Sequence, residues 1–512
     1  MPRTLIAAAS DVAAAAGKAV ADDGGNAVDA AIAATVASMT TELGIVSPGA
    51  GAFITIWPAD HEPVVIDAYA EMPGRGRPSA LEPDTRTVSM QYGGGMETVV
   101  GWGSVATPGA FAGFDRASSL FGTAPWSELL EPSVELARSG FAVTEASAYY
   151  LSYSHEVVYG WDAEAADLYH RTDGAPVEAG DIVTNPDLAD TLEALGTEHT
   201  GLLYGGELGA ALVQACTERG GLLTARDLIE YEAIERAPAR IDLHRWDVAT
   251  NAPPAVGGIT VAALVALIER LGITGWTARD VANYAAAQHA VFSFRRADLD
   301  GDKDRITAAA TLHAMATEGN LAAMHRSPST VHVSTVDATG MGCAITSSAG
   351  YGSGAVIPGT GFGLNNSLGE IELISEGLHA LEPGQRLLSN MAPTVARSPA
   401  GETLAIGSPG ADRITSAIVS VLLNHIVCGM DLEAAVAAPR IHAEWFEGVP
   451  TLAVEPGVDT SLVEDLAIRT LQPLAMYFGG VQAASIDPDG TMHGAADPRR
   501  TGAVAAGGAE HV

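Results

Sequence analysis

The residue of this sequence with the clearest chemical potential is Thr330, which stands where a polar, turn-rich stretch gives way to the alternating segment TVHVSTVD. A threonine hydroxyl is a poor nucleophile at neutral pH and needs a base beside it. If the bond between Ser329 and Thr330 breaks, Thr330 gains a free α-amine with an unperturbed pKa of about 8. The base and the hydroxyl oxygen Oγ1 then belong to the same residue. Thr330 could then attack an amide without a Ser-His-Asp triad. On composition alone, however, Thr330 fits better as the first residue of a strand, where threonine is common.

A second candidate element is the segment GSPGADRI at 407–414, in which a strand ends, a Pro-Gly turn follows and a helix begins. Backbone N–H groups at the start of a helix lack partners and attract anions. The N–H groups of Gly410 and Ala411 could therefore form an oxyanion hole, in which each donor stabilises a transition state by about 3–4 kcal/mol. Most turns of this kind only connect two elements, so this segment alone is weak evidence.

The segment RLLSNMAPT at 386–394 places two small hydrogen-bonding residues, Ser389 and Asn390, between apolar neighbours. They could position an acyl group, although a capped turn explains them better without further context. We expect no metal site and no organic cofactor. HExxH, GxSxG and Walker patterns are absent, and the 14 histidines do not fall at metal-ligand spacings. DLDGDKDR at 298–305 lacks the spacing of a calcium loop and is interpreted as a surface loop.

Composition limits the partners of this chain of 512 residues. The formal net charge of −35 comes from 62 acidic and 27 basic residues. Such a chain repels phosphate backbones and anionic lipid, which argues against nucleic-acid and membrane partners. The three cysteines (Cys216, Cys343 and Cys428) are far apart and predict neither a disulfide framework nor a zinc site. No signal peptide and no long uncharged apolar run is present, so we expect a cytoplasmic protein.

The elements that must position these residues follow from hydrophobic periodicity. Residues 4–39 predict two helices, 74–125 ordered loops, 310–329 an exposed connection and 495–512 a frayed tail. Further helices are predicted at 126–139, 186–196, 207–219, 258–271, 278–298 and 412–429, two of them with capping boxes at Thr224/Asp227 and Thr277/Asp280. Strands are predicted at 52–59, 62–70 and 403–408, with a hairpin at 331–337 and 343–348.

In their order along the chain, these segments resemble the γ-glutamyltranspeptidase family of N-terminal-nucleophile hydrolases. The similarity runs from about residue 4 to about residue 460. It is carried by GGNAVDAAIAA, GSVATPGAFAGFDRA, NAPPAVGGITV, TVHVSTVD, GSGAVIPGTGFGLNN and GSPGADRI. The resemblance implies an α+β fold, a four-layer αββα sandwich, and an enzyme that cuts its own chain.

The resemblance also implies roles for individual residues. Thr330 matches the catalytic threonine that self-cleavage frees, and Ser348 matches the second hydroxyl residue that hydrogen-bonds to it, with Thr346 as an alternative. Gly410 and Ala411 match the paired glycines of the oxyanion hole. Alanine replaces the second glycine, but the donor is its backbone N–H, so the function can survive. Ser389 and Asn390 match a serine pair that holds the substrate carboxylate.

The chain departs from the family at the site that binds the α-amino acid. Ala70 stands where the family has an arginine that clamps the substrate carboxylate, a bidentate role suited to guanidinium. Arg75 and Arg77 lie close by in the sequence, and we take Arg75 as a candidate substrate-binding residue. Glu370 matches the acidic residue that binds the α-amine, and Ser367 replaces a nearby glutamine. The reaction centre thus resembles the family, whereas the amino-acid clamp does not.

These observations predict a self-processing amidohydrolase or acyltransferase whose substrate is not a standard γ-glutamyl compound. Cleavage would leave residues 1–329 and 330–512 as an interleaved heterodimer that could oligomerise further. Its partners would be a small-molecule amide and either water or an amine acceptor. Three alternatives stay open. One is a genuine γ-glutamyl hydrolase or transpeptidase that recruits Arg75 or Arg77, another is an acylase for a different acyl or oxamate-like amide, and the third is an uncleaved homologue that only binds a ligand.

Overall fold

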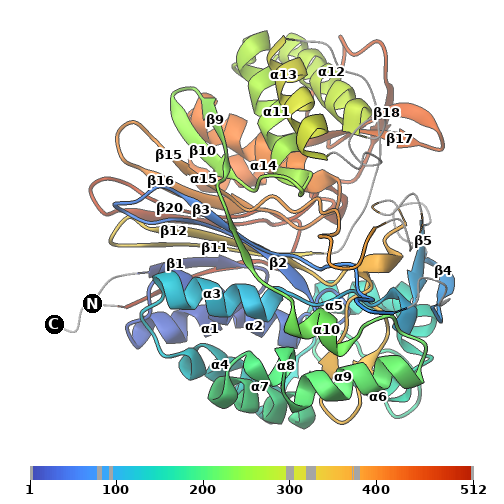
Figure 1. The fold of residues 1–512 in the computed structure, drawn as a ribbon. Helices are drawn as coiled ribbons and strands as arrows, with labels where there is room; N and C mark the ends of the chain where they lie inside the picture. Colours follow the sequence, from blue (N-terminus) through green and yellow to red (C-terminus); the bar gives the residue numbers. More distant parts are fainter. Residues whose placement is uncertain are drawn as a thin grey trace.

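Two stacked β-sheets form the centre of the molecule, with helices on both outer faces (Figure 1). The computed structural model describes residues 4–77, 83–90, 96–295, 305–318, 330–371, 373, 377 and 381–508. The first sheet has the order β22 (Ala503–Gly507), β1 (Thr4–Ala8), β11 (Val331–Asp337), β12 (Gly342–Ser348), β2 (Gly51–Trp57), β3 (Val64–Ala68) and β8 (Ile234–Arg236). The second has the order β21 (Met492–Ala496), β20 (Gln482–Ile486), β16 (Thr403–Gly407), β15 (Thr394–Arg397), β10 (Trp246–Thr250) and β9 (Ala239–Leu243).

The helices complete the four layers of the αββα sandwich expected from the family resemblance. The outer face of the first sheet is covered by α1 (Asp11–Asp22), α2 (Ala27–Thr41) and α3 (Ala110–Phe121), with α4 (Trp126–Ser139) and α7 (Pro186–Glu198) beyond them. The second sheet is covered by α11 (Gly257–Leu271), α14 (Arg413–Leu422) and α15 (Leu432–Ala437), with α12 (Ala278–Phe294) and α13 (Arg305–Glu318) packed outside. The remaining helices include α5 (Glu145–Ser154), α6 (Ala163–Tyr169), α8 (Gly201–Tyr204), α9 (Glu207–Glu218) and α10 (Ala225–Ile229).

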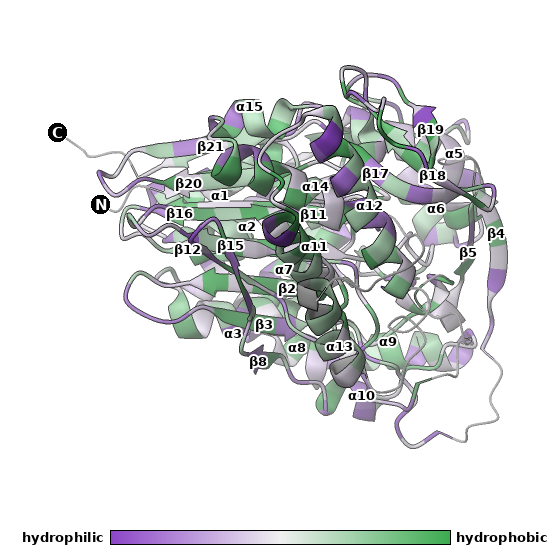
Figure 2. Cartoon of the chain, turned by 90° about the horizontal axis from the view of Figure 1, so that it is seen from above, coloured by the Kyte–Doolittle hydropathy of each residue, from purple (hydrophilic) through white to green (hydrophobic). Residues whose placement is uncertain are grey.

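Several smaller pairings lie around the sandwich: β4 (Arg86–Met90) with β5 (Met96–Val100), β6 (Phe141–Ala142) with β7 (Ile182–Val183), β13 (Val356–Ile357) with β14 (Phe362–Gly363), and β17 (Ile441–Phe446) with β18 (Val449–Val454) and β19 (Ala467–Thr470). Hydrophilic stretches lie, for example, beside β4 and β19 (Figure 2). None of the described helices is both long and apolar enough to span a membrane.

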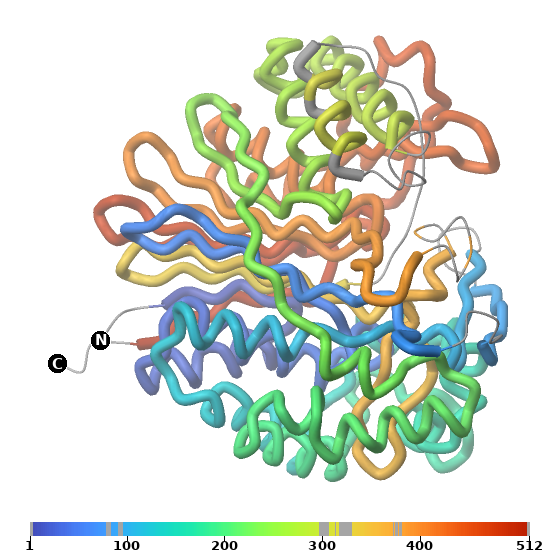
Figure 3. The backbone as a smooth tube through the Cα atoms, in the orientation of Figure 1, coloured from blue at the N-terminus to red at the C-terminus, as the bar shows by residue number. Residues whose placement is uncertain are grey.

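The chain passes from one sheet to the other along a shared edge. β8 ends the first sheet and β9 ends the second, and only residues 237 and 238 separate them. Figure 3 shows this segment rising along the outside of the sandwich from α10 to β9. The two sheets then pack directly, since β11 contacts β16 and β20. This packing brings the strand that begins after Thr330 against the strand that ends at Gly407.

Helix α2 shows why small residues suit this architecture. Every one of its residues is buried, and its N-terminus has a capping box between Asn26 and Asp29. Alanine side chains let the helix approach the sheet closely, and helix and sheet are tied together by two hydrogen bonds. The Thr335 hydroxyl donates to the Ala27 carbonyl at 2.7 Å, and the Ala27 N–H donates to Asp337 at 3.2 Å. Buried, satisfied polar contacts of this kind fix one register of the helix on β11.

Most predicted elements are confirmed. The hairpin forms as β11 and β12, the early strand pair as β2 and β3, and both predicted capping boxes are present. The predicted helices at 126–139, 186–196, 207–219, 258–271 and 278–298 correspond to α4, α7, α9, α11 and α12 within the described residues.

Four predictions are wrong, and tertiary pairing or packing explains each. Residues 4–8 form strand β1 instead of helix because they pair with both β11 and β22. The predicted loop region 74–125 contains helix α3, which packs with Phe111 and Phe114 buried. The predicted connection 310–329 begins as helix α13, in which Leu312 and Ala316 are buried. The predicted frayed tail contains β22, which is held by β1.

Candidate active site

Thr330 lies directly before β11 and is buried, with 4% of its surface exposed. In the sheet, Val331 pairs with Ser347, Ser348 pairs with Gly51, and Ala52 pairs with Ala68. Continuing these antiparallel registers by one residue places Thr330, Ser348, Gly51 and Tyr69 in one row across β11, β12, β2 and β3. Residues directly opposite in antiparallel strands have side chains on the same face. The row therefore brings the hydroxyls of Thr330 and Ser348 together.

The register also distinguishes Ser348 from Thr346 as the second hydroxyl residue. Thr346 pairs with His332, and its Oγ1 lies 2.8 Å from the Nδ1 of His332. Ser348 lies opposite Thr330, and its Oγ accepts a hydrogen bond from the Gly350 N–H at 3.1 Å. Because the Thr346 hydroxyl is engaged by His332, the geometry favours Ser348 as the neighbour of Thr330.

His332 is a residue of this region that sequence reasoning missed. Its Nε2 lies 2.8 Å from the Ser334 hydroxyl, so both ring nitrogens have partners. Complete burial lowers the pKa of His332 to about 3, which keeps the ring neutral at ordinary pH. A Cβ placed on Gly407 would lie 2.2 Å from the His332 Cε1, so the ring packs on the last residue of β16. The available sequence signal was the run of polar residues at alternate positions 330, 332 and 334.

Gly410 and Ala411 lie in the turn between β16 and α14. Their φ angles are +123° and +68°, in the region that favours glycine. A Cβ on Gly410 would lie 2.7 Å from the Gly479 Cα, so the close approach also requires glycine there. Ala411 holds a left-handed conformation that costs a non-glycine residue about 1–2 kcal/mol. Within the described part of the chain, neither N–H has a hydrogen-bond acceptor, as an oxyanion hole requires.

The segment that carries Ser389 and Asn390 runs beside the residues that follow β3. The Met72 N–H donates to the Gln385 carbonyl at 2.8 Å, and the Leu387 N–H donates to the Ala70 carbonyl at 3.0 Å. The Ser389 Oγ accepts from the Met391 N–H at 3.2 Å. Asn390 is only 5% exposed, yet neither atom of its side-chain amide has a partner among the described residues. A buried amide without partners is unfavourable unless a ligand satisfies it.

Tyr69 joins these residues to Glu370, and sequence reasoning missed it too. Its hydroxyl donates to Glu370 Oε1 at 3.3 Å, with the hydroxyls of Ser367 and Ser389 also close by. Burial, reinforced by the charge of Glu370, raises the pKa of Tyr69 well above its ordinary value, so its hydroxyl stays protonated. The ring stacks on Phe53 with centroids 5.7 Å apart.

The place of Tyr69 in the sheet depends on a glycine. A Cβ on Gly51 would lie 2.7 Å from the Tyr69 ring, so the ring reaches across β2 where Gly51 has no side chain. The ring therefore extends along the row toward Ser348. Its position next to Ala70 in the sequence was the only signal that could have identified it.

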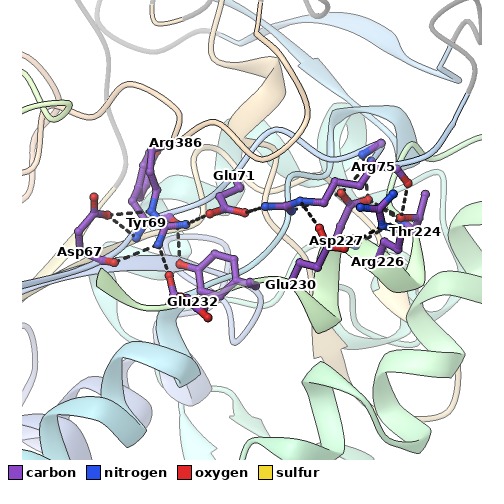
Figure 4. A network of polar contacts seen from close by, with 12 residues as sticks. Asp67, Tyr69, Glu71, Arg75, Thr224, Arg226, Asp227, Glu230, Glu232 and Arg386 are labelled. Atoms are coloured by element: carbon purple, nitrogen blue, oxygen red, sulfur yellow. Dashed lines mark hydrogen bonds and ion pairs between the residues drawn. The ribbon is translucent and has the colours of Figure 1, made fainter. Parts of the chain in front are cut away.

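Arg75 is held in a separate network of charges (Figure 4). Its guanidinium donates to Glu71 at 2.8 Å and faces Glu230 and Asp227 at 3.3 and 3.5 Å. Arg77 donates to the Gly221 carbonyl. The geometry thus gives no support to Arg75 as the residue that binds a substrate carboxylate.

Arg386 belongs to the same network as Arg75. It pairs with Asp67 at 3.2 Å and with Glu71, and it lies 4.6 Å from the centre of the Tyr231 ring. Figure 4 shows Glu71 between the two arginines. Arginines that share carboxylates in this way stabilise the loop after β3, and their charges are balanced by these carboxylates.

Other residues with possible chemical roles lie outside the described residues or away from this site. Ser329 lies outside the described residues, so the predicted cleavage bond is not among the described parts of the chain. Burial raises the pKa of the Cys216 thiol to about 12 and also raises that of Cys343, which makes both poor nucleophiles. Among the described residues, no group of three histidine, cysteine or acidic side chains is arranged to hold a metal ion.

Comparison with known proteins agrees with the motifs and the fold. The sequence profile described as Gamma-glutamyltranspeptidase matches residues 13–507. The chain is 30% identical over 523 residues to the Acylase ACY 1 proenzyme of Pseudomonas sp. (strain V22), covering 98% of this chain and 93% of that protein. It is 28% identical over 522 residues to the glutathione hydrolase proenzyme of Escherichia coli (strain K12), covering 95% of this chain and 88% of that protein.

A solved structure gives the same picture of the fold. The crystal structure of cephalosporin acylase from Bacillus halodurans superposes with a TM-score of 0.79 at 22% sequence identity, covering 98% of this chain and 96% of that one. At this identity the likeness establishes the fold alone.

Proposed function

The chain belongs to the gamma-glutamyltranspeptidase family of amidohydrolases and acyltransferases, and from this premise we propose that Thr330, freed by cleavage after Ser329, is its nucleophile. The observation that carries the proposal is the strand register that sets Thr330 opposite Ser348. The N–H groups of Gly410 and Ala411 in the turn after β16, which meet no acceptor among the described residues, support it. Cleavage would leave residues 1–329 and 330–512 as two chains.

The sheet order supports a stable association of the two cleavage products. In the first sheet β11 and β12 lie between β1 and β2, so strands from 330–512 are flanked by strands from 1–329. In the second sheet β15 pairs with β10, which again joins the two parts. Because strands of each part alternate with strands of the other, the products would remain an interleaved heterodimer after the bond is broken.

The proposed reaction proceeds through an ester on Thr330. The Oγ1 attacks the substrate amide carbon while the α-amine of Thr330 takes its proton, and the oxyanion is stabilised by the N–H groups of Gly410 and Ala411. The α-amine then gives the proton to the leaving amine as the C–N bond breaks. Water or an acceptor amine attacks the ester and releases the acyl group. The Ser348 hydroxyl orients Oγ1 by a hydrogen bond.

We propose that the substrate is not a standard γ-glutamyl compound, since Ala70 replaces the arginine of the family and Arg75 is engaged by three carboxylates. A second candidate is a genuine γ-glutamyl hydrolase, like the relative from Escherichia coli named glutathione hydrolase. The proximity of Glu370 to Tyr69 and Ser389 favours that candidate, because the Glu370 carboxylate could hold the α-amine of a γ-glutamyl group.

The test is intact-mass measurement of the purified protein, followed by assay on amide substrates. We expect the species of 52.4 kDa to be replaced by two fragments whose sequences meet at Thr330. The matched control is Thr330→Ala, which should stay uncut and inactive. A wild-type chain that stays intact after prolonged incubation and hydrolyses no amide would instead indicate an uncleaved homologue that only binds a ligand.

A further inference from the structure

The acyl-recognition site, defined here as Tyr69, Glu370, Ser389 and Asn390, combines hydrogen-bonding groups with a buried carboxylate. All four residues are at most 5% exposed. Tyr69 links the site to the nucleophile because its ring crosses Gly51 in the row that contains Ser348 and Thr330. Adjacent strands are about 4.8 Å apart, so three spacings put the Tyr69 and Thr330 Cα atoms roughly 14 Å apart. The Tyr69 ring, which lies over Gly51, shortens this gap.

Two arginines close in sequence to this site already form ion pairs with carboxylates. Arg75 is engaged by Glu71, Asp227 and Glu230, and Arg386 by Asp67 and Glu71. Ala70 offers no charge. A carboxylate on the acyl group would therefore lose its hydration and meet the carboxylate of Glu370, a costly arrangement in a buried site.

The same residues offer acceptors to a bound amine. Glu370 supplies carboxylate oxygens, and the Ser389 hydroxyl lies beside Tyr69. Asn390 supplies an amide oxygen that, like its amide nitrogen, has no partner among the described residues. An ammonium group has three N–H donors and no acceptor, so it matches this set. Charge-assisted hydrogen bonds are also stronger than neutral ones.

We propose that Tyr69 and Ala70 set the acyl specificity of this enzyme, and that the acyl-recognition site takes an acyl group that carries an amine and no carboxylate. This inference rests on the proposed function, in which Thr330 is the nucleophile. Glu370 and Asn390 hold the amine, and Tyr69 fixes the Glu370 carboxylate while filling the space next to Ala70.

Four p-nitroanilides separate the two charges of the acyl group. The γ-glutamyl compound carries both amine and carboxylate, γ-aminobutyryl only the amine, glutaryl only the carboxylate, and butyryl neither. We expect kcat/KM to be highest for γ-aminobutyryl, by roughly 10- to 100-fold over butyryl, the usual effect of a hydrogen bond to a charged group. Both compounds with a carboxylate should fall below butyryl.

Two variants test the assignment of residues. Glu370→Gln should bring the ratio of γ-aminobutyryl to butyryl turnover close to one, whereas a merely structural role would lower both rates and leave their ratio unchanged. Ala70→Arg should raise the ratio of γ-glutamyl to γ-aminobutyryl turnover by about tenfold or more, because guanidinium can pair with the carboxylate.

The outcomes distinguish this inference from the proposed function. A cleaved chain that prefers the glutaryl or γ-glutamyl compound, that turns over none of the four, or whose ratio survives Glu370→Gln would overturn the inference while leaving the nucleophile in place. An uncut chain with no turnover would overturn the proposed function, and this inference with it.

Discussion

The reaction centre and the acyl-recognition site differ in what holds their chemistry in place. At the proposed reaction centre, Thr330 and Ser348 are set by strand register, and the groups that would bind the oxyanion are the backbone N–H groups of Gly410 and Ala411. In the acyl-recognition site, the groups are side chains on segments that follow β3 or lie between strands, such as Tyr69 and Asn390. A register cannot change at one position without moving a whole strand. Side chains beyond the strand end can be exchanged singly, so specificity can change while the reaction stays the same.

The largest effect should come from removing the nucleophile. Thr330→Ala should lower kcat/KM by about 10⁴-fold or more, because it removes the oxygen proposed to attack the amide. Thr330→Ser keeps an oxygen and should retain measurable activity. The measurement is single-turnover hydrolysis of the best of the four p-nitroanilides. Activity of Thr330→Ala close to that of wild type would mean that the reaction centre lies elsewhere.

The next effect concerns the oxyanion turn. Gly410→Ala adds a Cβ that would lie 2.7 Å from the Gly479 Cα and disfavours the φ of +123°. We expect the turn to shift and kcat to fall by about 10²- to 10³-fold, as when one oxyanion donor is lost. Gly401→Ala is a matched control, since Gly401 also has a positive φ but lies in the turn between β15 and β16. Equal losses in both variants would indicate general destabilisation.

A substitution of Arg75 tests whether this residue stabilises the fold or belongs to the acyl-recognition site. Arg75→Met should lower the free energy of unfolding by about 3 kcal/mol, because it leaves Glu71 and Asp227 without this partner in a partly buried network. It should change KM less than about threefold. Arg116→Met, which breaks an exposed pair with Glu235, is the control and should cost less than about 1 kcal/mol. A rise in KM for γ-glutamyl-p-nitroanilide without loss of stability would make Arg75 the carboxylate clamp after all.

His332, two residues after Thr330, should make the free energy of unfolding depend on pH. Its pKa is about 3 in the folded protein and near 6.5 when unfolded, so the unfolded chain binds more protons between these values. The contribution of neutral His332 to the free energy of unfolding is therefore complete above pH 6.5 and is lost as the pH falls toward 3. One pKa unit corresponds to about 1.4 kcal/mol, so His332 should cost roughly 2 kcal/mol at pH 5.

The measurement is urea unfolding of wild type and His332→Asn at pH 7 and pH 5. The asparagine amide can still contact the Thr346 hydroxyl but has no proton to gain in this range. We expect the wild type to lose about 2 kcal/mol more than the variant between the two pH values. Equal losses would show that His332 is not the group responsible.

The same contrast explains what could be predicted from sequence. Thr330, Ser348 and the turn at 407–411 lie in linear motifs with a periodic strand pattern, and the early strand pair and hairpin followed from the same alternation. Tyr69 could not be found in that way, because its role depends on Gly51 in another strand and on Glu370 and Ser389 in distant loops. The strand at 4–8 was missed for a similar reason, since only its pairing with β11 and β22 overrides the helix propensity of its alanines.

The smallest effect should come from Ala411, whose side chain we expect to take no part in the reaction. If its role is to supply a backbone N–H, Ala411→Gly should change kcat less than about threefold. Relief of the left-handed strain at φ +68° is offset by the greater freedom of glycine in the unfolded chain, so stability should change by less than about 1 kcal/mol. Ala411→Val keeps the N–H but places a β-branched residue at positive φ, and it should be the least stable of the three. Thermal unfolding together with kcat for alanine, glycine and valine at this position provides the test. A large loss of kcat in the glycine variant would mean that the methyl group itself takes part, and the reaction centre would then depend on side chains as the acyl-recognition site does.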